Sequence, residues 1–363
     1  MVASFSLLPG EEDGFPPATF LDLIPNGEAT LCANVEPTYV SGSAIFHCVA
    51  SFSSIGDHGL VATAGMAPGP IILSTEVEEN VIEPFPFDAA QTGLTGSWFS
   101  PYTDGQGFEF VVYPDSEGNA YFYGGWFTYL ADRDGPYWLT LQGPLDSAHG
   151  NAYSQLGVYE SDVGNFAAPP QTESQRIGDA TLTFHDCAHA TLDFSLDGSA
   201  SGTIPLVRLT APTGCSMDVP AAPPSPPPAH YNDALHSGVW YQPETAGQGL
   251  TVDLDPAQST FFALWYTYAP GPNDPNTPAY RWFALQANYT PGDLSLTDVP
   301  IYITEAGVFD QPSDVTREIV GSANVTFISC NEMTLDYAFT SGELAGTSGS
   351  IDEHNALPAP GCE

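Results

Sequence analysis

The segment His185-Asp186-Cys187-Ala188-His189 holds residue types that can bind a transition metal. On an extended strand, residues 185, 187 and 189 point to one face, and two imidazoles with a thiolate are ligands that zinc or copper accepts. A second copy of the surrounding pattern has Ile328, Cys330 and Glu332 at these positions. Because the shared cysteine has a later cysteine to pair with in both copies, a disulfide beside incidental histidines is favoured. We therefore predict no metal site here.

Two acidic turns, DSEGN (115–119) and DRDG (132–135), carry oxygen ligands of the kind that calcium prefers. Neither completes an EF-hand loop, and Asp, Gly and Asn are ordinary turn residues. We expect no cofactor, with calcium as the alternative. The chain has no nucleophile elbow, HExxH motif, Cys–His nucleophile or phosphate-binding loop. No catalytic residue is predicted, although a carboxylate pair of a glycosidase could be hidden among the acids.

The aromatic residues give the most specific candidate site. All six tryptophans fall into three matched pairs, and a GQG turn follows the first tryptophan of each copy. Aromatic faces with nearby amides are the groups that stack on and hydrogen-bond a sugar ring. The alternatives are that the tryptophans fill a core and that each glutamine satisfies the backbone of its own turn. The predicted ligand-binding residues are Trp98, Trp126, Trp138, Gln106, Trp240, Trp265, Trp282 and Gln248.

These pairs belong to a longer internal repeat. GGWFTY (124–129) matches ALWYTY (263–268), PYWLTLQG (136–143) matches YRWFALQA (280–287), and IGDATLTFHDC (177–187) matches VGSANVTFISC (320–330). The predicted domains are a first repeat at 93–216, a proline-rich linker at 217–234 and a second repeat at 235–363. Residues 1–90 match neither repeat and are predicted to form a small N-terminal β domain, with an immunoglobulin-like sandwich as one form.

The fold class follows from alternation. Segments such as FEFVVYP (108–114) and AYFYGGWFTYL (120–130) alternate large apolar with small or polar residues between Gly, Pro, Asp and Asn punctuation. We predict an all-β protein with two homologous antiparallel β-barrel or sandwich repeats. The pattern W-[FY]-x-P…GQG…W-[FY]-T-Y resembles a tandem repeat module of secreted bacterial proteins, and its opening loosely resembles avidin-like barrels. Neither resemblance implies an activity or a ligand.

Composition restricts the partners and the compartment. The chain has 363 residues, 44 acidic against five basic ones and a net charge of −39, and all five basic residues are arginine. Such a charge argues against nucleic acid and anionic membranes and suits a salty medium. No apolar run is long enough to predict a membrane span. Six cysteines without a CxxC motif predict three sequential disulfides in an oxidising compartment, formed by Cys32, Cys48, Cys187, Cys215, Cys330 and Cys362.

We therefore expect a protein that is secreted, extracellular or on the cell surface, and that lost a signal peptide before its present N-terminus. A duplicated module without a catalytic motif favours binding or adhesion through two weak contacts, with a polysaccharide or cell-surface glycan as the partner. Self-assembly as a structural surface or filament subunit is the first alternative. A secreted hydrolase with an unrecognised site is the second, and an enzyme is the less favoured class.

Overall fold

In the computed structural model, the chain divides into two compact units, Met1–Glu83 and Pro84–Glu363. The structure describes the backbone of seven strands before residue 78 and the chain from residue 87 onward. Gaps within that second part fall at 116, 131–134, 147–149, 162–163, 170, 199, 212–213, 218–230, 272–278, 359–361 and 363, and at the side chain of residue 231.

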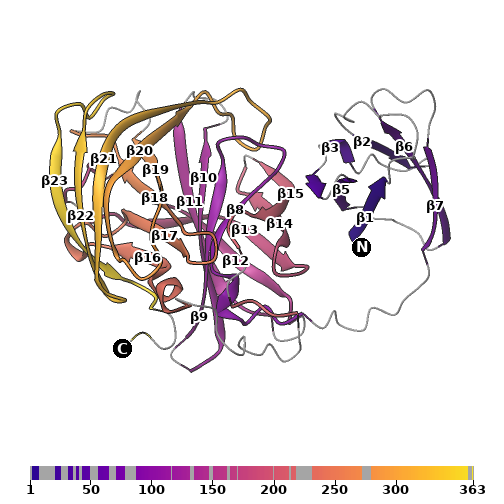
Figure 1. Ribbon diagram of the computed structural model, residues 1–363, viewed down its shortest axis with the longest axis horizontal. Coiled ribbons are helices and arrows are strands. Elements are labelled where there is room, and N and C mark those ends of the chain that lie inside the picture. Colours follow the sequence, from indigo (N-terminus) through magenta and orange to yellow (C-terminus); the bar gives the residue numbers. More distant parts are fainter. Residues whose placement is uncertain are drawn as a thin grey trace. The chain divides into compact units, whose positions relative to one another are not determined.

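The second unit contains two closed antiparallel barrels of eight strands each (Figure 1). The first barrel is built from β8 (Gly96–Phe99), β9 (Gly107–Pro114), β10 (Ala120–Tyr129), β11 (Pro136–Pro144), β12 (Ala152–Ser161), β13 (Ser174–Phe184), β14 (His189–Leu196) and β15 (Ser201–Arg208). The second is built from β16 (Gly238–Tyr241), β17 (Gly249–Asp255), β18 (Thr260–Tyr268), β19 (Tyr280–Asn288), β20 (Ser295–Glu305), β21 (Thr316–Ser329), β22 (Glu332–Phe339) and β23 (Ser348–Asn355). The prediction of an all-β fold with two antiparallel repeats is confirmed.

Each barrel is an up-and-down meander in which neighbours in sequence are neighbours in the sheet. The first barrel closes where Arg208 of β15 pairs with Trp98 of β8, and the second where Asn355 of β23 pairs with Trp240 of β16. Closure removes the unpaired strand edges that an open sheet would expose. Short 3₁₀ helices precede or follow the first strands: η1 (Thr92–Leu94), η2 (Tyr231–His236) and η3 (Pro243–Thr245).

The first unit contains two small antiparallel sheets, ordered β1-β5-β4 and β3-β2-β6-β7. Their strands are β1 (Val2–Leu7), β2 (Leu21–Pro25), β3 (Cys32–Val35), β4 (Thr38–Val40), β5 (Ser43–Val49), β6 (Gly56–Ala64) and β7 (Ile71–Val77). The immunoglobulin-like form proposed for this segment stays a prediction.

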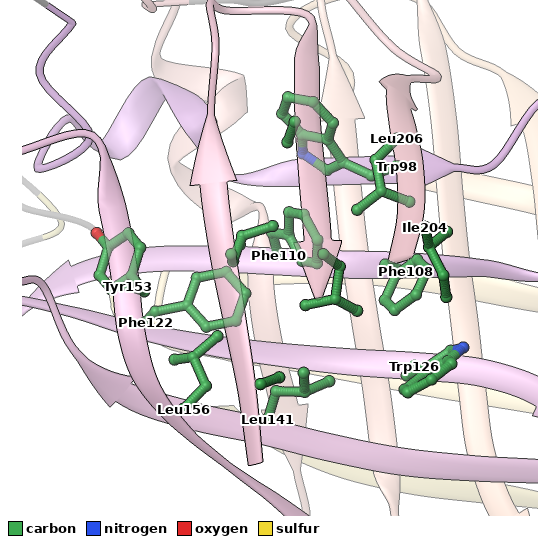
Figure 2. Close-up of a cluster of buried hydrophobic side chains, with 14 of the residues drawn as sticks. Trp98, Phe108, Phe110, Phe122, Trp126, Leu141, Tyr153, Leu156, Ile204 and Leu206 are labelled. Atoms are coloured by element: carbon green, nitrogen blue, oxygen red, sulfur yellow. The ribbon is translucent and has the colours of Figure 1, made fainter. Parts of the chain in front are cut away.

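The interior of the first barrel is filled with aromatic and aliphatic side chains (Figure 2). Alternate residues of β9 and β10 point inward, so that Phe108 stacks on Trp126 with ring centroids 5.2 Å apart and Phe110 meets Phe122 edge to face. Burying a tryptophan removes about 150–250 Å² from water, which contributes about 4–6 kcal/mol as an upper estimate. The barrel interior is therefore a packed core.

Each barrel repeat ends with one disulfide. Cys187 is bonded to Cys215, and Cys330 is bonded to Cys362. These are two of the three predicted pairs, whereas the third, Cys32 with Cys48, lies outside the residues whose side chains the structure describes. Among the described residues, no helix is both long and apolar enough to cross a membrane.

Candidate functional site

The two barrels face each other through the outer surfaces of β10, β11, β18 and β19. A buried aromatic cluster joins them, here called the inter-barrel cluster: Phe127, Tyr129, Trp138, Leu264, Tyr266, Tyr268 and Trp282. Trp138 Nε1 donates to the carbonyl oxygen of Thr267 at 3.1 Å, and Trp282 Nε1 donates to that of Thr128 at 3.1 Å. The tryptophan of each barrel therefore donates to the equivalent threonine carbonyl of the other barrel, as in a twofold-symmetric dimer interface.

The glutamine of the first GQG turn binds a loop of the second barrel. Gln106 Nε2 donates to the carbonyl oxygen of Val308 at 3.0 Å. Its Oε1 accepts from Thr128 Oγ1 at 2.6 Å and from the Asp310 amide at 3.1 Å. The side-chain amide is thus occupied by a loop that lies about 200 residues later in the chain.

The glutamine of the second turn binds the first barrel in the same way. Gln248 Nε2 donates to the carbonyl oxygen of Asn165 at 2.9 Å, and Oε1 accepts from the Ala167 amide at 3.0 Å and from Thr267 Oγ1 at 2.6 Å. Gln248 is buried. Both glutamines therefore act as hydrogen-bonding clips. The alternative drawn from the sequence was that each glutamine satisfies the backbone of its own turn, whereas each one binds a loop of the opposite barrel.

The first glycine of each turn is required by two features. Gly105 has φ 67° and Gly247 has φ 100°, values in the left-handed region that favours glycine. A Cβ on Gly105 would lie 2.8 Å from Thr304 of the second barrel, and a Cβ on Gly247 would lie within van der Waals radii of Thr172 of the first. The turn must therefore lack a side chain for the barrels to approach.

Each clipped loop also inserts a phenylalanine into the opposite barrel. Phe166, on the loop between β12 and β13, packs against Trp265 and Tyr337 of the second barrel, with centroids 5.3 and 5.9 Å away. Phe309, between β20 and β21, packs against Trp126 and Phe194 of the first at 5.2 and 5.9 Å. The sequence predictions missed these two residues. The signal was a third repeated motif, Gly164-Asn165-Phe166 and Gly307-Val308-Phe309.

All six tryptophans are buried, with exposed fractions between 0 and 5%. Trp98, Trp126, Trp240 and Trp265 belong to the barrel cores, whereas Trp138 and Trp282 belong to the inter-barrel cluster. The tryptophans therefore do not expose their faces for stacking on a sugar, and their burial agrees with the alternative that they fill a core. Their large apolar area is used for packing, in the cores and between the barrels.

Two clefts nevertheless open at the inter-barrel interface, and predicted site residues line them. Cleft A, about 360 Å³, is lined by Ser97, Trp98, Phe99, Thr103, Asp104, Gly105, Gln106, Gly107, Phe108, Phe127, Leu209, Phe262, Leu264, Trp282, Ala284, Gln286, Tyr302, Thr304 and Arg317. Cleft B, about 330 Å³, is lined by Tyr113, Tyr123, Trp138, Thr140, Gln142, Tyr159, Ser161, Ser174, Val239, Tyr241, Gly247, Gln248, Tyr266, Ala356 and Leu357. The structure thus brings Trp98, Gln106 and Trp282 to one cleft and Trp138 and Gln248 to the other.

The two clefts are equivalent positions of the repeat. Ala284 pairs with Tyr302 across β19 and β20, as Thr140 pairs with Tyr159 across β11 and β12. When the two copies are aligned on Trp138 and Trp282, Gln286 is the equivalent of Gln142. Each cleft therefore presents one glutamine, from β19 or β11, and one tyrosine from the next strand, β20 or β12. A buried tryptophan, Trp282 or Trp138, also lines each cleft.

The lining glutamines are available to a ligand. Gln286 is exposed and Gln142 is half-buried, and neither side-chain amide forms a hydrogen bond to another described residue. Tyr302, Tyr159 and Tyr241 are half-buried, so part of each ring borders the cleft. An aromatic edge beside an unpaired amide is the combination that a small polar ligand with apolar faces requires.

A third region between the barrels holds the buried carboxyl groups Glu109 and Asp253. Asp253 of β17 accepts from the Ser97 amide at 2.9 Å, from Ser97 Oγ at 3.1 Å and from Thr210 Oγ1 at 2.6 Å. The Ser97 hydroxyl is also hydrogen-bonded to Glu109. Burial, reinforced by the charge of Asp253, raises the pKa of Glu109 well above its usual range. The adjoining cavity is only about 50 Å³, so this cluster joins the barrels and does not hold a ligand of sugar size.

One buried carboxyl lies inside the second barrel. Glu353 is two residues before the closing Asn355 and corresponds to Leu206 of the first barrel, which lies two residues before Arg208. It is 2% exposed, and its Oε2 has no hydrogen-bond partner among the described residues. Burial raises the pKa of Glu353 to about 8. It is not among the lining residues of either cleft and is not part of the candidate site.

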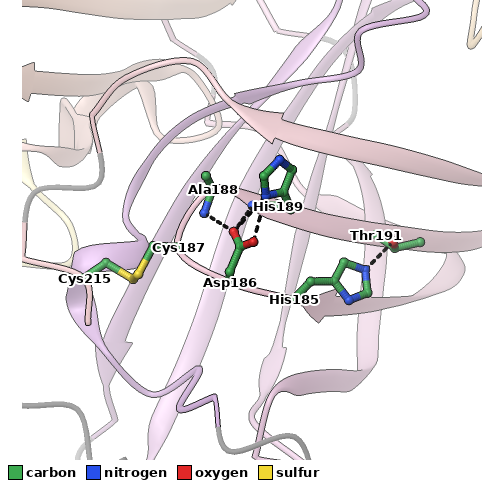
Figure 3. Close-up of polar contacts among 7 residues, drawn as sticks. All are labelled: His185, Asp186, Cys187, Ala188, His189, Thr191 and Cys215. Atoms are coloured by element: carbon green, nitrogen blue, oxygen red, sulfur yellow. Dashed lines mark hydrogen bonds and ion pairs between the residues drawn. A yellow bond between two sulfur atoms is a disulfide. The ribbon is translucent and has the colours of Figure 1, made fainter. Parts of the chain in front are cut away.

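The HDCAH segment is a stabilised turn (Figure 3). Asp186 Oδ1 accepts from the Ala188 and His189 amides at 2.6 and 2.8 Å, and His189 Nδ1 lies 2.8 Å from Asp186 Oδ2. His185 Nε2 contacts Thr191 Oγ1 at 2.7 Å, and Cys187 is in a disulfide. Favouring a disulfide over a metal trio was correct, because a bonded sulfur cannot supply a thiolate.

The acidic turn at Asp115 is satisfied by its own backbone. Asp115 Oδ1 accepts from the amides of Glu117 and Asn119 at 2.8 and 2.9 Å, and these hydrogen bonds lower the pKa of Asp115. The other turn proposed for calcium, DRDG, falls mostly outside the described residues. In the described part of the chain, no group of three or more His, Cys, Asp and Glu side chains is arranged to hold a metal ion.

Comparison of this chain with family models, curated proteins and solved structures gives no match.

Proposed function

We propose that the protein is a secreted carbohydrate-binding protein that holds one sugar in each of the two inter-barrel clefts. The observation that carries the proposal is the repetition of cleft A in cleft B. Gln286 and Tyr302 recur as Gln142 and Tyr159, and Thr304 recurs as Ser161. The barrel fold does not require an unpaired amide or a half-exposed tyrosine at these positions, so their recurrence supports a shared ligand contact.

The size and lining of the clefts fit a sugar unit. Volumes of about 360 and 330 Å³ lie at the lower end of the range found for small-molecule sites. Tyrosine and phenylalanine side chains offer apolar surface to the C–H face of a sugar ring, while the amides and hydroxyls bond its hydroxyl groups. The contacts proposed here are therefore Gln142, Tyr159 and Tyr241 in cleft B, and Gln286, Tyr302 and Phe99 in cleft A.

Two sites fixed on one rigid interface would give avidity for a polymer. Each site on its own is expected to bind weakly, and simultaneous engagement raises the effective concentration of the second. The disulfides Cys187–Cys215 and Cys330–Cys362 support an oxidising, extracellular location. Hydrolysis is less well supported in these clefts, because Asp104 is the sole carboxylate among their described lining residues and glycosidases use a pair.

The test is a titration of the intact protein with a panel of oligosaccharides, in which isothermal titration calorimetry measures the affinity and the number of sites. An oligosaccharide that both clefts accept should show two sites. The double variant Gln142→Ala/Tyr159→Ala should leave one, as should Gln286→Ala/Tyr302→Ala. Gln155→Ala is the matched control, because Gln155 is exposed on β12 and lies outside both cleft linings.

Binding whose stoichiometry is unchanged in both double variants would contradict the assignment of the clefts. A silent panel together with concentration-dependent light scattering would instead favour the structural surface or filament subunit.

A further inference from the structure

The two clefts differ in charge at one equivalent position. On β20 of the second barrel, Thr304 pairs with Arg317 of β21, and Arg317 lines cleft A. On β12 of the first barrel, Ser161 pairs with Ser174 of β13, which lines cleft B. A guanidinium therefore stands in cleft A where cleft B has a hydroxyl.

Arg317 is unusual among the few cations of this chain. The other arginines that the structure describes are all engaged: Arg176 is paired with Asp179, Arg281 with Glu343, and Arg208 is hydrogen-bonded to the carbonyl oxygens of Gly93 and Thr95. Arg317 is exposed and has no ion-pair partner among the described residues. In a chain with 44 acidic residues and five basic ones, an unpaired arginine in a cleft is the feature that needs an explanation.

The chemistry of the surrounding wall suits a carboxylate on a sugar. A guanidinium presents donors in a planar fork that matches a carboxylate, and it gives stronger, shorter hydrogen bonds than a neutral donor. Gln286 and Tyr302 on the neighbouring strands supply an unpaired amide and a half-buried ring for the rest of the sugar. Asp104, the other charged residue of the lining, would repel a carboxylate held near it and can instead accept from a sugar hydroxyl.

We propose that cleft A binds an acidic sugar, a uronic acid unit of a polysaccharide, with its carboxylate on Arg317, whereas cleft B binds a neutral sugar. The inference rests on the proposed function and specifies its ligand. The negative field of the protein opposes an anionic ligand at long range, and salt screens this repulsion more than the contact itself.

The experiment compares oligosaccharides of galacturonic, glucuronic and mannuronic acid with their carboxyl-reduced, neutral counterparts, by calorimetry on the full chain at fixed ionic strength. In Arg317→Gln, the affinity for at least one acidic oligosaccharide should fall tenfold or more, while affinity for neutral ones stays within twofold. Arg317→Lys should recover only part of the loss. Arg176→Gln, an exposed arginine outside the clefts, is the control and should match the parent protein.

Three results would overturn the inference. Binding of neutral oligosaccharides with acidic ones rejected, or acidic binding unchanged in Arg317→Gln, would remove the uronic acid specificity and leave the proposed function standing. Absence of binding to every acidic and neutral probe would remove both. Because Arg317 is exposed and forms no ion pair with a described residue, its substitution should not prevent folding, and an unchanged thermal midpoint would verify this.

Discussion

The indole N–H of Trp138 in the first barrel donates to the backbone carbonyl of Thr267 in the second at 3.1 Å, and Trp282 returns the same bond to Thr128. This reciprocal pair explains why the chain repeats an aromatic pattern that is buried in both copies. A tryptophan that packs on the outside of one barrel satisfies its N–H on the other. The two copies therefore behave as the halves of a dimer joined in one chain.

Removing the second clip should destabilise the protein more than removing the first. Gln248→Ala leaves the buried Thr267 Oγ1 and the part-buried Ala167 amide without their acceptor, at a cost of about 1–3 kcal/mol for each group that stays out of reach of water. Gln106 is only half-buried, so water can replace part of its bonding in Gln106→Ala. Urea denaturation measures both. Gln286→Ala, which breaks no hydrogen bond to a described residue, is the control. Equal losses in the two clip variants would contradict the burial argument.

Truncating the inserted phenylalanines should loosen the barrel pair. Phe166 is 8% exposed and lies among Trp265, Tyr337 and Phe339, so Phe166→Ala should cost about 3–5 kcal/mol. Phe309 is less buried, and its truncation should cost less. Chemical denaturation gives the free energies, and hydrogen exchange should show faster exchange in the opposite barrel. Unchanged exchange in that barrel would mean that the insertion does not couple the two.

The second barrel should lose stability as pH rises because of Glu353. Its pKa is about 8 in the folded protein, raised by burial above the ordinary value of about 4.3 in the unfolded chain. The folded state thus holds a proton that the unfolded state releases. The stabilising contribution is complete below about pH 4 and falls by about 1.4 kcal/mol per pH unit until it levels off above the folded pKa.

Glu353→Leu, which copies Leu206 of the first barrel, removes that proton and should be stabilising at pH 8. The measurement is urea denaturation of parent and variant between pH 5 and 9. The difference in unfolding free energy should widen with pH in favour of the variant, with Glu353→Gln showing the same pH trend. Parallel curves would contradict the burial of an ionisable carboxyl at this position.

Each barrel disulfide should contribute separately. The pairs Cys187–Cys215 and Cys330–Cys362 span 28 and 32 residues, for which loop entropy gives about 3–4 kcal/mol each. The double substitution of either pair by alanine should lower the unfolding free energy by that amount, and both together by about twice as much, since the bonds lie in different barrels. Reduction of the parent protein should reproduce the combined loss in the unfolding of the barrel unit, Pro84–Glu363. A much smaller loss from one pair would mean that its segment is already ordered by other contacts.

The duplication could be recognised in the sequence because both copies carry the same strand and turn residues in the same order. Paired tryptophans, the GQG turns and the alternating segments predicted two homologous antiparallel β units, and closed barrels are one of the two forms expected. The alternation could not show which tryptophans face inward. Residues 124–129 of β10 are all buried, because one face packs in the barrel and the other against the second barrel. A strand buried on both faces loses the alternating pattern that would separate them.

The candidate site was only partly predictable. The sequence identified Gln106, Gln248, Trp138 and Trp282 as unusual, and they do lie at the clefts, but as contacts that join the barrels. It missed Gln142, Gln286 and Arg317, which look like ordinary polar positions on alternating strands.

By itself, the sequence determined two disulfide-bonded β units that are related by duplication and carried on an acid-rich chain. Only the tertiary structure decided that these units pack face to face and that Phe166 and Phe309 each insert into the opposite barrel. It also decided that Glu109 and Asp253 are buried between the barrels. The physical reason is that alternation and turn residues encode contacts within a sheet. A contact between sheets instead depends on which outer faces meet, and distant residues such as Trp138 and Thr267 become neighbours only when both barrels have closed.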